Sequence, residues 1–212
     1  MSLACSENNA RLKTMTVTGN GNITTDPDTA IIRLGVQTNG EPLSEMQSQN
    51  AQITQNIIDS LKQLGINDIK TFQYTIEKAY DYQNGNRIDL GYTVRNILEI
   101  RTDHLEQIGT IIDVSVSQGA NVVDLISFEV SEPELYYQQA LNLAVMNACQ
   151  KAKSIAINLG VVLNTTPIKI IESGSTPIPY SRFNVSREGS LATPIESGDI
   201  KISASVTVIF QY

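Results

Sequence analysis

Two hydrophobic periods alternate along residues 29 to 130, and their order constrains the fold more than any other feature of the sequence. Apolar residues recur at every second position in stretches typical of strands, and at every third or fourth position in stretches typical of helices. In chain order these stretches predict strand, helix, strand, strand, helix, strand. This β-α-β-β-α-β order is that of a ferredoxin-like unit, in which helices cover one side of a sheet.

The predicted strands are marked by alternating side chains. Residues 30–37 and 72–76 alternate, and Asn84-Gly85 predicts a hairpin tip that leads into a return strand over 92–100. Three further strands are predicted over the ranges 122–130, 168–171 and 200–210. The last of these keeps a strict period of two, which is typical of a sheet with one solvated face.

Three helices are predicted from start and stop signals. Capping boxes open them, with an early proline in the third, and glycines end them. The start signals are Ser44 with Gln47, Asp103 with Glu106, and Ser131 with Pro133 and Glu134; the stop signals are Gly65, Gly119 and Gly160. The first helix is therefore expected near residues 44–64, the second from 103 to 119, and the third from 131 to 160.

These elements together predict an α+β fold. We expect an antiparallel-rich mixed sheet with helices packed on one side, made of the ferredoxin-like run and an extra β/α/β-β portion. A hydrophobic share of 41% and a charged share of 17% are typical of a soluble globular chain. Because no composition shift marks a linker, we expect residues 14–212 to form a single domain and one compact unit, with a long loop at 174–198 and a disordered tail at 1–13.

The charge balance argues against a nucleic-acid partner. The chain has 22 acidic and 15 basic residues, a net charge of −7, and its lysines and arginines are scattered. Binding of phosphates requires a clustered basic surface. No run of apolar residues approaches the length of a membrane span, so we expect no transmembrane segment.

The N-terminal tail carries a candidate lipidation site. Residues 1–9 have neither a basic nor an apolar region of the signal-peptide type. Cys5, followed by a polar stretch, is similar to the first residue of a mature bacterial lipoprotein, in which the cysteine carries lipid and the stretch acts as a tether. The alternative is an ordinary cysteine in a disordered tail.

The segment 174–198 is rich in Pro, Gly and Ser and is longer than a usual connection, so it is either functional or mobile. Its aromatic and basic residues make it a candidate contact or ligand loop: Tyr180, Arg182, Phe183 and Arg187. The alternative is a loop that is ordered only by its neighbours.

The run Gly19-Asn20-Gly21-Asn22-Ile23-Thr24 resembles part of a nucleotide-binding loop. A third glycine and an immediate helix start are missing, because Thr24 is followed by Asp26-Pro27 and then by a strand. Nor does a glutamate stand at the twelfth position that a calcium loop requires. We therefore interpret this run as a connection between two strands, in which the glycines adopt positive φ.

Catalytic and metal-binding constellations are not evident. A zinc site needs several His or Cys ligands at short spacing, whereas the chain has one histidine, His104, and two distant cysteines. We expect His104 to be solvated at the start of the second helix, and we predict no metal, no cofactor and no catalytic residue.

The third predicted helix has an alanine at every fourth position. The series is Ala140, Ala144, Ala148, Ala152 and Ala156. Small side chains let backbones approach closely, which predicts packing of this helix onto the sheet; a contact between helices of two subunits is the alternative. Cys149 beside this face is expected to be a small buried side chain, not a reactive thiol.

Four stretches of the chain resemble the SIMPL-domain family: "VTGNGNITTDPDTAIIRLGVQT", "DVSVSQGANVVDLISFEVSE", "ALNLAVMNACQKAKSIAINLGV" and "ATPIESGDIKISASVTVIFQY". The resemblance covers residues 15 to 212, although Asn20 stands where a charged residue is often found. It implies an exported or cell-envelope protein similar to bacterial periplasmic immunogenic and oxidative-stress defence proteins. Some bacterial relatives form ring-like or channel-like oligomers, and a mammalian relative is a kinase-pathway adaptor. The family brings no established catalytic residues.

Two functional hypotheses follow. The first is a non-enzymatic envelope protein, periplasmic or lipid-anchored, that acts through self-association and protein contacts, with a connection to oxidative-stress defence. The second is a small anionic-ligand-binding module or hydrolase that uses a cleft under the 174–198 loop, with Tyr180, Arg182 and Arg187 recognising the anion.

Overall fold

The computed structural model describes residues 13–84, 86–173, 180–181 and 193–212, and these divide into two compact units. Unit 1 comprises the N-terminal segment up to Thr25, Glu132–Tyr180 and Lys201–Tyr212; unit 2 comprises Asp26–Ser131 and Ser181–Ile200. A unit assembled from three separate segments leaves no composition shift at a single boundary, so the sequence does not mark the two units. That residues 14–212 fold as one domain stays a prediction.

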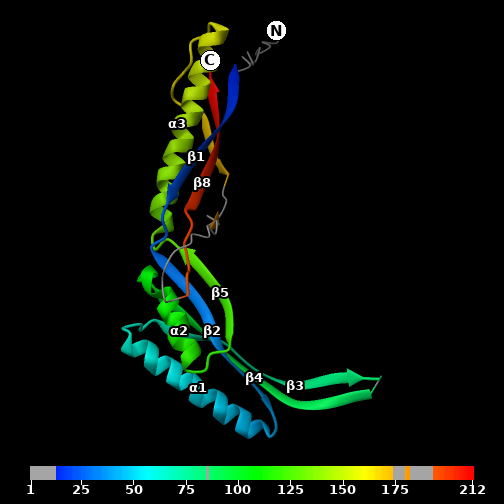
Figure 1. Cartoon of the computed structure of the whole chain (residues 1–212). Coiled ribbons are helices and arrows are strands. Elements are labelled where there is room, and N and C mark those ends of the chain that lie inside the picture. The colour runs from blue at the N-terminus through cyan, green and yellow to red at the C-terminus, as the bar shows by residue number, and fades with distance from the viewer. Residues whose placement is uncertain (1–12, 85, 174–179, 182–192) are drawn as a thin grey trace, which may run out of the picture. The chain divides into compact units, whose positions relative to one another are not determined.

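Unit 2 has the predicted ferredoxin-like order. Its elements are β2 (Thr29–Gly40), α1 (Leu43–Gln63), β3 (Ile69–Gln83), β4 (Asn86–Thr102), the 3-10 turn η1 (Leu105–Gln107), α2 (Ile108–Ser117) and β5 (Val122–Glu129). The sheet order is β3-β4-β2-β5, and the three neighbouring pairs are antiparallel (Figure 1). The α+β class and the order of elements are therefore confirmed.

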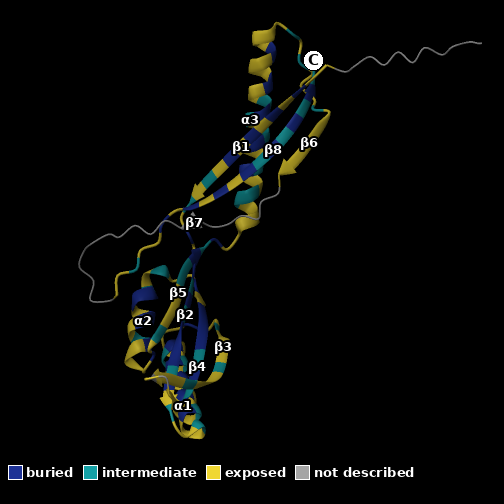
Figure 2. Cartoon of the chain, turned by 90° about the vertical axis from the view of Figure 1, so that its right-hand side faces the viewer, coloured by how far each residue is buried: buried dark blue, intermediate teal, exposed yellow. Residues whose placement is uncertain are grey.

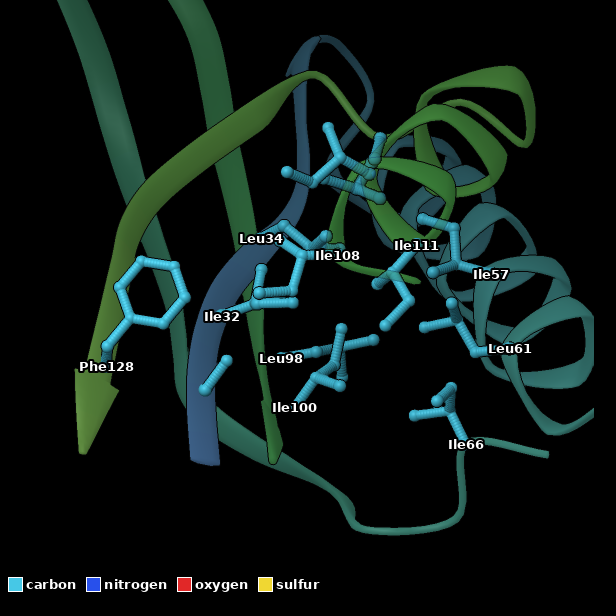
Figure 3. Close-up of a cluster of buried hydrophobic side chains, with 14 residues drawn as sticks. Ile32, Leu34, Ile57, Leu61, Ile66, Leu98, Ile100, Ile108, Ile111 and Phe128 are labelled. Atoms are coloured by element: carbon cyan, nitrogen blue, oxygen red, sulfur yellow. The ribbon is translucent and has the colours of Figure 1, made fainter. Parts of the chain in front are cut away.

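The core of unit 2 lies between one face of this sheet and the two helices. Alternate residues of β2, among them Ile32 and Leu34, share this face with Leu98 and Ile100 of β4. Ile57 of α1 belongs to the same cluster (Figure 3). Fully burying an aliphatic side chain of this size contributes about 1.5–3 kcal/mol, so the alternation predicted from the sequence is what anchors the sheet to its helices.

The predicted capping boxes are wrong, although the helices are present. The helix N-termini at Pro42, Gln107 and Glu132 show no side-chain capping bond. At the first helix the carbonyl oxygen of Pro42 accepts the backbone N–H of Glu45 instead. At the third, the Ser131 hydroxyl and backbone N–H both donate to the carboxylate of Asp28, each at 2.7 Å. Ser131 therefore bonds to Asp28, which is distant in sequence, and does not cap its own helix.

Unit 1 is built around a long helix on a sheet. Its elements are β1 (Thr14–Thr25), α3 (Pro133–Leu159), β6 (Lys169–Ser173) and β8 (Ile200–Gln211), of which Ile200 is counted with unit 2; the two residues of β7 (Tyr180–Ser181) are divided between the units. The order is β1-β8-β6, and β7 also pairs with β8. The five alanines of α3 are buried with alternate residues of β1 and β8, so the predicted packing of this helix onto the sheet is confirmed; other parts of its surface are exposed (Figure 2).

The glycine run is a strand interior, which corrects the expected connection between strands. Gly19 and Gly21 lie within β1, and neither adopts positive φ. A Cβ built on Gly19 would lie 2.0 Å from the carbonyl oxygen of Ala144, and one on Gly21 would lie 2.0 Å from that of Ala140. The glycines are required because the backbone of α3 approaches the strand so closely.

Candidate interaction surface on the β3–β4 hairpin

The strands β3 and β4 extend beyond the rest of their sheet. β2 ends at Gly40, which is paired with Tyr92 of β4. Among the described strands, Tyr80–Gln83 and Asn86–Asp89 pair only with each other. We call residues 79–84 and 86–91 the arm; Figure 1 shows it running past the end of β2. A ribbon of two strands is only marginally stable alone in water, so the arm needs further support.

A β-bulge at Gly91 stands where the arm begins. From the pair Lys78–Tyr92 to the pair Tyr80–Asp89, β3 advances two residues while β4 advances three. Gly91 has φ +82°, and a Cβ on it would lie 2.5 Å from the carbonyl oxygen of Gly40. A bulge bends a strand and increases its twist, so this glycine sets the direction in which the arm leaves the sheet.

One face of β3 carries a row of large, exposed side chains. Alternate residues of a strand share a face, which places Tyr74, Ile76, Lys78, Tyr80 and Tyr82 together; we call them the tyrosine stripe. The exposed fractions are 49% for Tyr74, 38% for Ile76, 40% for Tyr80 and 71% for Tyr82. A contiguous exposed apolar row of this kind is typical of an interaction surface.

Two cations lie near the ring of Tyr80 in the stripe. The Lys78 ammonium lies 2.5 Å from the Asp89 carboxylate and 5.7 Å from the ring centroids of Tyr80 and Tyr92. The Arg87 guanidinium lies 4.3 Å from the ring centroid of Tyr80. A cation over an aromatic face is attracted by the ring quadrupole. These contacts favour one position of the Tyr80 ring within the stripe.

The Lys78–Asp89 pair shifts the pKa of both members. The hydrogen bond to Asp89 raises the pKa of Lys78 above its ordinary value. The same bond, followed by one from the backbone N–H of Gly91 at 3.0 Å, lowers the pKa of Asp89. Both groups are therefore charged at neutral pH, and the pair ties the bulge to the stripe.

The opposite face of the same sheet carries charges that are paired within the chain. Glu99 contacts Arg33 at 2.7 Å and Lys70 at 2.9 Å, and the Arg33 guanidinium lies 3.6 Å from the ring centroid of Phe72. Hydrogen bonds from Lys70 and then Arg33 lower the pKa of Glu99. Because these charges are paired with one another, they need no ligand to compensate them. The tyrosine stripe, in contrast, exposes apolar surface that a partner could cover.

The candidate site residues predicted from sequence fall outside the described residues, apart from the backbone of Tyr180. Tyr180 lies in β7, but its side chain is outside the described part of the chain, as are Arg182, Phe183, Arg187 and Cys5. The anion-binding hypothesis and the lipidation of Cys5 therefore stay predictions.

The end of the 174–198 segment is held on α2. The backbone N–H and hydroxyl of Thr193 donate to the carboxylate of Asp113 at 3.1 and 2.6 Å. Ile195 packs against the core of unit 2. This part of the predicted long loop is therefore anchored through both polar and apolar contacts.

His104 and Cys149 are the remaining residues that the sequence singled out. The His104 side chain is 55% exposed, with Asp103 at 3.8 Å and Glu106 at 3.6 Å. Cys149 is partly buried against the alanine-rich cluster. In the described part of the chain, no group of three His, Cys, Asp or Glu residues could hold a metal ion.

Sequence reasoning missed the tyrosine stripe, although a signal for it exists. Residues 72–76 were predicted as a strand, but the alternation continues to Tyr82, and four of the eight tyrosines fall between positions 74 and 92. When the alternate residues of a strand are large and apolar, those residues are usually predicted to be buried in a hydrophobic core. The arm differs because, among the described elements, no helix or third strand packs along its length.

Fold and surface together define an α+β protein with a ferredoxin-like unit, a second sheet-and-helix unit and an exposed aromatic hairpin. The chain belongs to the SIMPL family, described as a protein of unknown function (DUF541), whose model matches residues 15–210. Among the helices of the described residues, none is both long enough and apolar enough to cross a membrane.

The similar proteins cover nearly the whole chain. The 26 kDa periplasmic immunogenic protein of Brucella melitensis is 29% identical, over 92% of this chain and 83% of its own length. The uncharacterized protein YggE of Escherichia coli K12 is 23% identical, over 91% and 80%. Among solved structures, an amidase of the hydantoinase/carbamoylase family from Burkholderia phymatum aligns with 62% of this chain and 35% of its own, at 13% identity and a TM-score of 0.24, which supports no statement about fold or activity.

Proposed function

We propose that this chain is an exported cell-envelope protein that acts without catalysis, through self-association and contacts with other proteins. The observation that carries the proposal is the arm, which exposes Tyr80, Tyr82 and Leu90 at 40%, 71% and 53% on a ribbon of only two strands. Covering these side chains removes apolar surface from water and supports the ribbon at the same time.

The location is proposed from the names of similar proteins. Two relatives, from Brucella melitensis and Brucella abortus, are named periplasmic immunogenic proteins, each 29% identical to this chain. Fractionation of the native cell tests this: we expect the protein in the periplasmic or envelope fraction, and recovery from the cytoplasm contradicts it. Mass spectrometry of the native product tests the lipid on Cys5, which an unmodified cysteine would exclude.

Self-association is tested by sedimentation velocity over a wide range of protein concentrations. We expect wild-type protein to assemble, and a variant with Tyr80→Ser, Tyr82→Ser and Leu90→Ser to remain smaller at every concentration. The matched control changes three exposed residues of α3, Leu135, Met146 and Ile157, to serine. A wild-type protein that stays monomeric at every concentration overturns the proposal.

A role in oxidative-stress defence rests on the family resemblance alone. If assembly is what the protein contributes, cells that carry the arm variant should be as sensitive to peroxide as cells that lack the protein. Survival equal to wild type in both strains would remove this part of the proposal.

A further inference from the structure

The outer edge of β3 has no strand partner among the described strands, because β3 ends the order β3-β4-β2-β5. Such an edge presents outward-facing backbone N–H and C=O groups that can pair with another strand. β3 runs from Ile69 to Gln83 and contains no proline. It is therefore a long edge strand, although near its end the backbone N–H of Tyr82 already donates to the Asp81 carboxylate at 2.8 Å.

One part of this edge is protected against pairing with another strand, and another part has a regular backbone that favours pairing. Phe72 is the extra residue of a bulge, since β3 advances two residues from Thr71 to Gln73 while β4 advances one. A bulge and a lysine such as Lys70 discourage pairing at an edge. From Gln73 to Lys78 the register with β4 is unbroken, and Ile76 lies within this stretch.

The charges along β3 make several symmetric registers unfavourable. Two copies that pair antiparallel about a two-fold axis place one residue opposite its own copy. An axis at Glu77, Lys78 or Asp81 puts like charges opposite each other, which is unfavourable. An axis at Ile76 lies within the regular stretch from Gln73 to Lys78 and brings no two like charges opposite each other. It places Tyr74 opposite Lys78, a cation and an aromatic ring, twice per dimer.

We propose that two copies of this chain pair through the outer edges of their β3 strands, antiparallel, about a two-fold axis at Ile76. This inference rests on the self-association proposed above and names its partner and geometry. Pairing makes one continuous sheet from the two copies, so it supplies the additional strand support that the hairpin lacks. It also joins the two tyrosine stripes into one surface.

A membrane surface is the less favoured occupant. Around the stripe, the acidic residues Glu77, Asp81 and Asp89 outnumber the basic residues Lys78 and Arg87, and the chain carries a net charge of −7. Anionic lipids attract basic segments, not acidic ones. A lipid headgroup also cannot form the regular backbone ladder that a strand edge offers.

Charge reversal at the two-fold axis tests the proposal directly. In the Ile76→Lys variant and in the Ile76→Glu variant, like charges meet across the axis, so each alone should dimerise at least about tenfold more weakly than wild type. An equimolar mixture should recover dimerisation, because lysine then faces glutamate. The matched controls are Ile88→Lys and Ile88→Glu, since Ile88 on the inner strand β4 is 37% exposed against 38% for Ile76; neither should weaken the dimer.

A cross-link supplies an independent measurement. Directly opposite residues of an antiparallel pair have Cα atoms about 4.5–5.5 Å apart, which a disulfide can span. In a background of Cys5→Ser and Cys149→Ala, Ile76→Cys should cross-link to its own copy under mild oxidation. Ile88→Cys in the same background should not. Circular dichroism confirms that each variant is folded.

The outcomes separate this inference from the proposed function. Recovery in the mixture together with the Ile76→Cys cross-link supports the β3 dimer. Wild-type assembly that survives both charge variants, with no cross-link, overturns the β3 edge while leaving self-association intact. A monomeric wild type overturns both, and stripe-dependent binding to vesicles of phosphatidylglycerol by such a monomer assigns the surface to lipid instead.

Discussion

Gly19 of β1 lies so close to α3 that a Cβ built on it would stand 2.0 Å from the carbonyl oxygen of Ala144 and 2.8 Å from the Cβ of Ala148. The alanines of α3 and the glycines of β1 therefore face each other in one contact. Both sets of residues are small because the two backbones lie close together. This contact sets how closely the long helix sits on its sheet in unit 1.

Gly19→Ala should strongly destabilise unit 1. The added methyl group meets backbone atoms, which cannot move aside as a flexible side chain can, and overpacking of this kind costs about 1–3 kcal/mol or more. Urea denaturation followed by circular dichroism measures the loss. Asn20→Ala is the control, because the exposed neighbouring side chain should change stability by less than about 0.5 kcal/mol. Equal stability of the two variants would contradict the close contact.

The glycine run shows where sequence reasoning reached its limit. Two glycines separated by one residue are compatible both with a turn and with one face of a strand, and the turn was predicted because no partner was visible. That partner, α3, is more than a hundred residues away in the chain. The alanine spacing on α3 was readable and its packing was predicted, but the link between the two patterns is a long-range contact that neither pattern contains.

Asn50→Leu should destabilise unit 2 although it adds apolar volume to an apolar core. Asn50 is fully buried in α1, and its amide donates to the backbone oxygens of Val36 at 3.1 Å and Val94 at 3.0 Å. Each carbonyl left without its donor costs about 1–3 kcal/mol. Denaturation midpoints measure the effect, with Gln55→Leu on the exposed side of the same helix as control. A neutral or stabilising Asn50→Leu would show that these bonds contribute little.

The pairing of Glu99 should make stability dependent on pH at the acid end. Lys70 and Arg33 lower the pKa of Glu99 in the folded state, whereas in the unfolded chain a glutamate titrates near about 4.3. The stabilisation is therefore fully present above about pH 4.3 and is lost as pH falls through the folded pKa. Glu99→Gln should cost on the order of 1 kcal/mol at neutral pH, and this difference should shrink in acid.

Denaturation of wild type and Glu99→Gln across the acid range checks this dependence. Glu132→Gln, at an exposed residue, is the control and should leave the pH profile unchanged. A difference between wild type and Glu99→Gln that stays constant down to strong acid would mean that the ion pairs do not stabilise the fold.

The ends of the helices could be predicted from the sequence, whereas the bonds at their starts could not. Gly65, Gly119 and Gly160 end their helices as predicted, and all three adopt positive φ. The stop signal is local, because a glycine relieves strain in its own backbone. The predicted start signals were wrong because a serine side chain can bond to any acceptor that the fold brings near it. Ser131 donates to Asp28, which lies 103 residues earlier.

The tyrosine stripe was missed for a related reason. Alternation shows that a strand has two different faces, but it does not show whether another element covers the apolar one.

Gly91→Ala should impair assembly more than a comparable glycine substitution elsewhere. Both Gly91 and Gly65 adopt positive φ, at +82° and +86°, so alanine costs about 1–2 kcal/mol at either site. Only at Gly91 does the added Cβ also meet backbone, 2.5 Å from the Gly40 oxygen; at Gly65 nothing lies within 4 Å. The bulge must shift, and the arm then leaves the sheet in another direction. Sedimentation at a temperature where both variants are folded should therefore show weaker assembly for Gly91→Ala than for Gly65→Ala. Equal assembly of the two folded variants would mean that the direction of the arm is irrelevant to self-association.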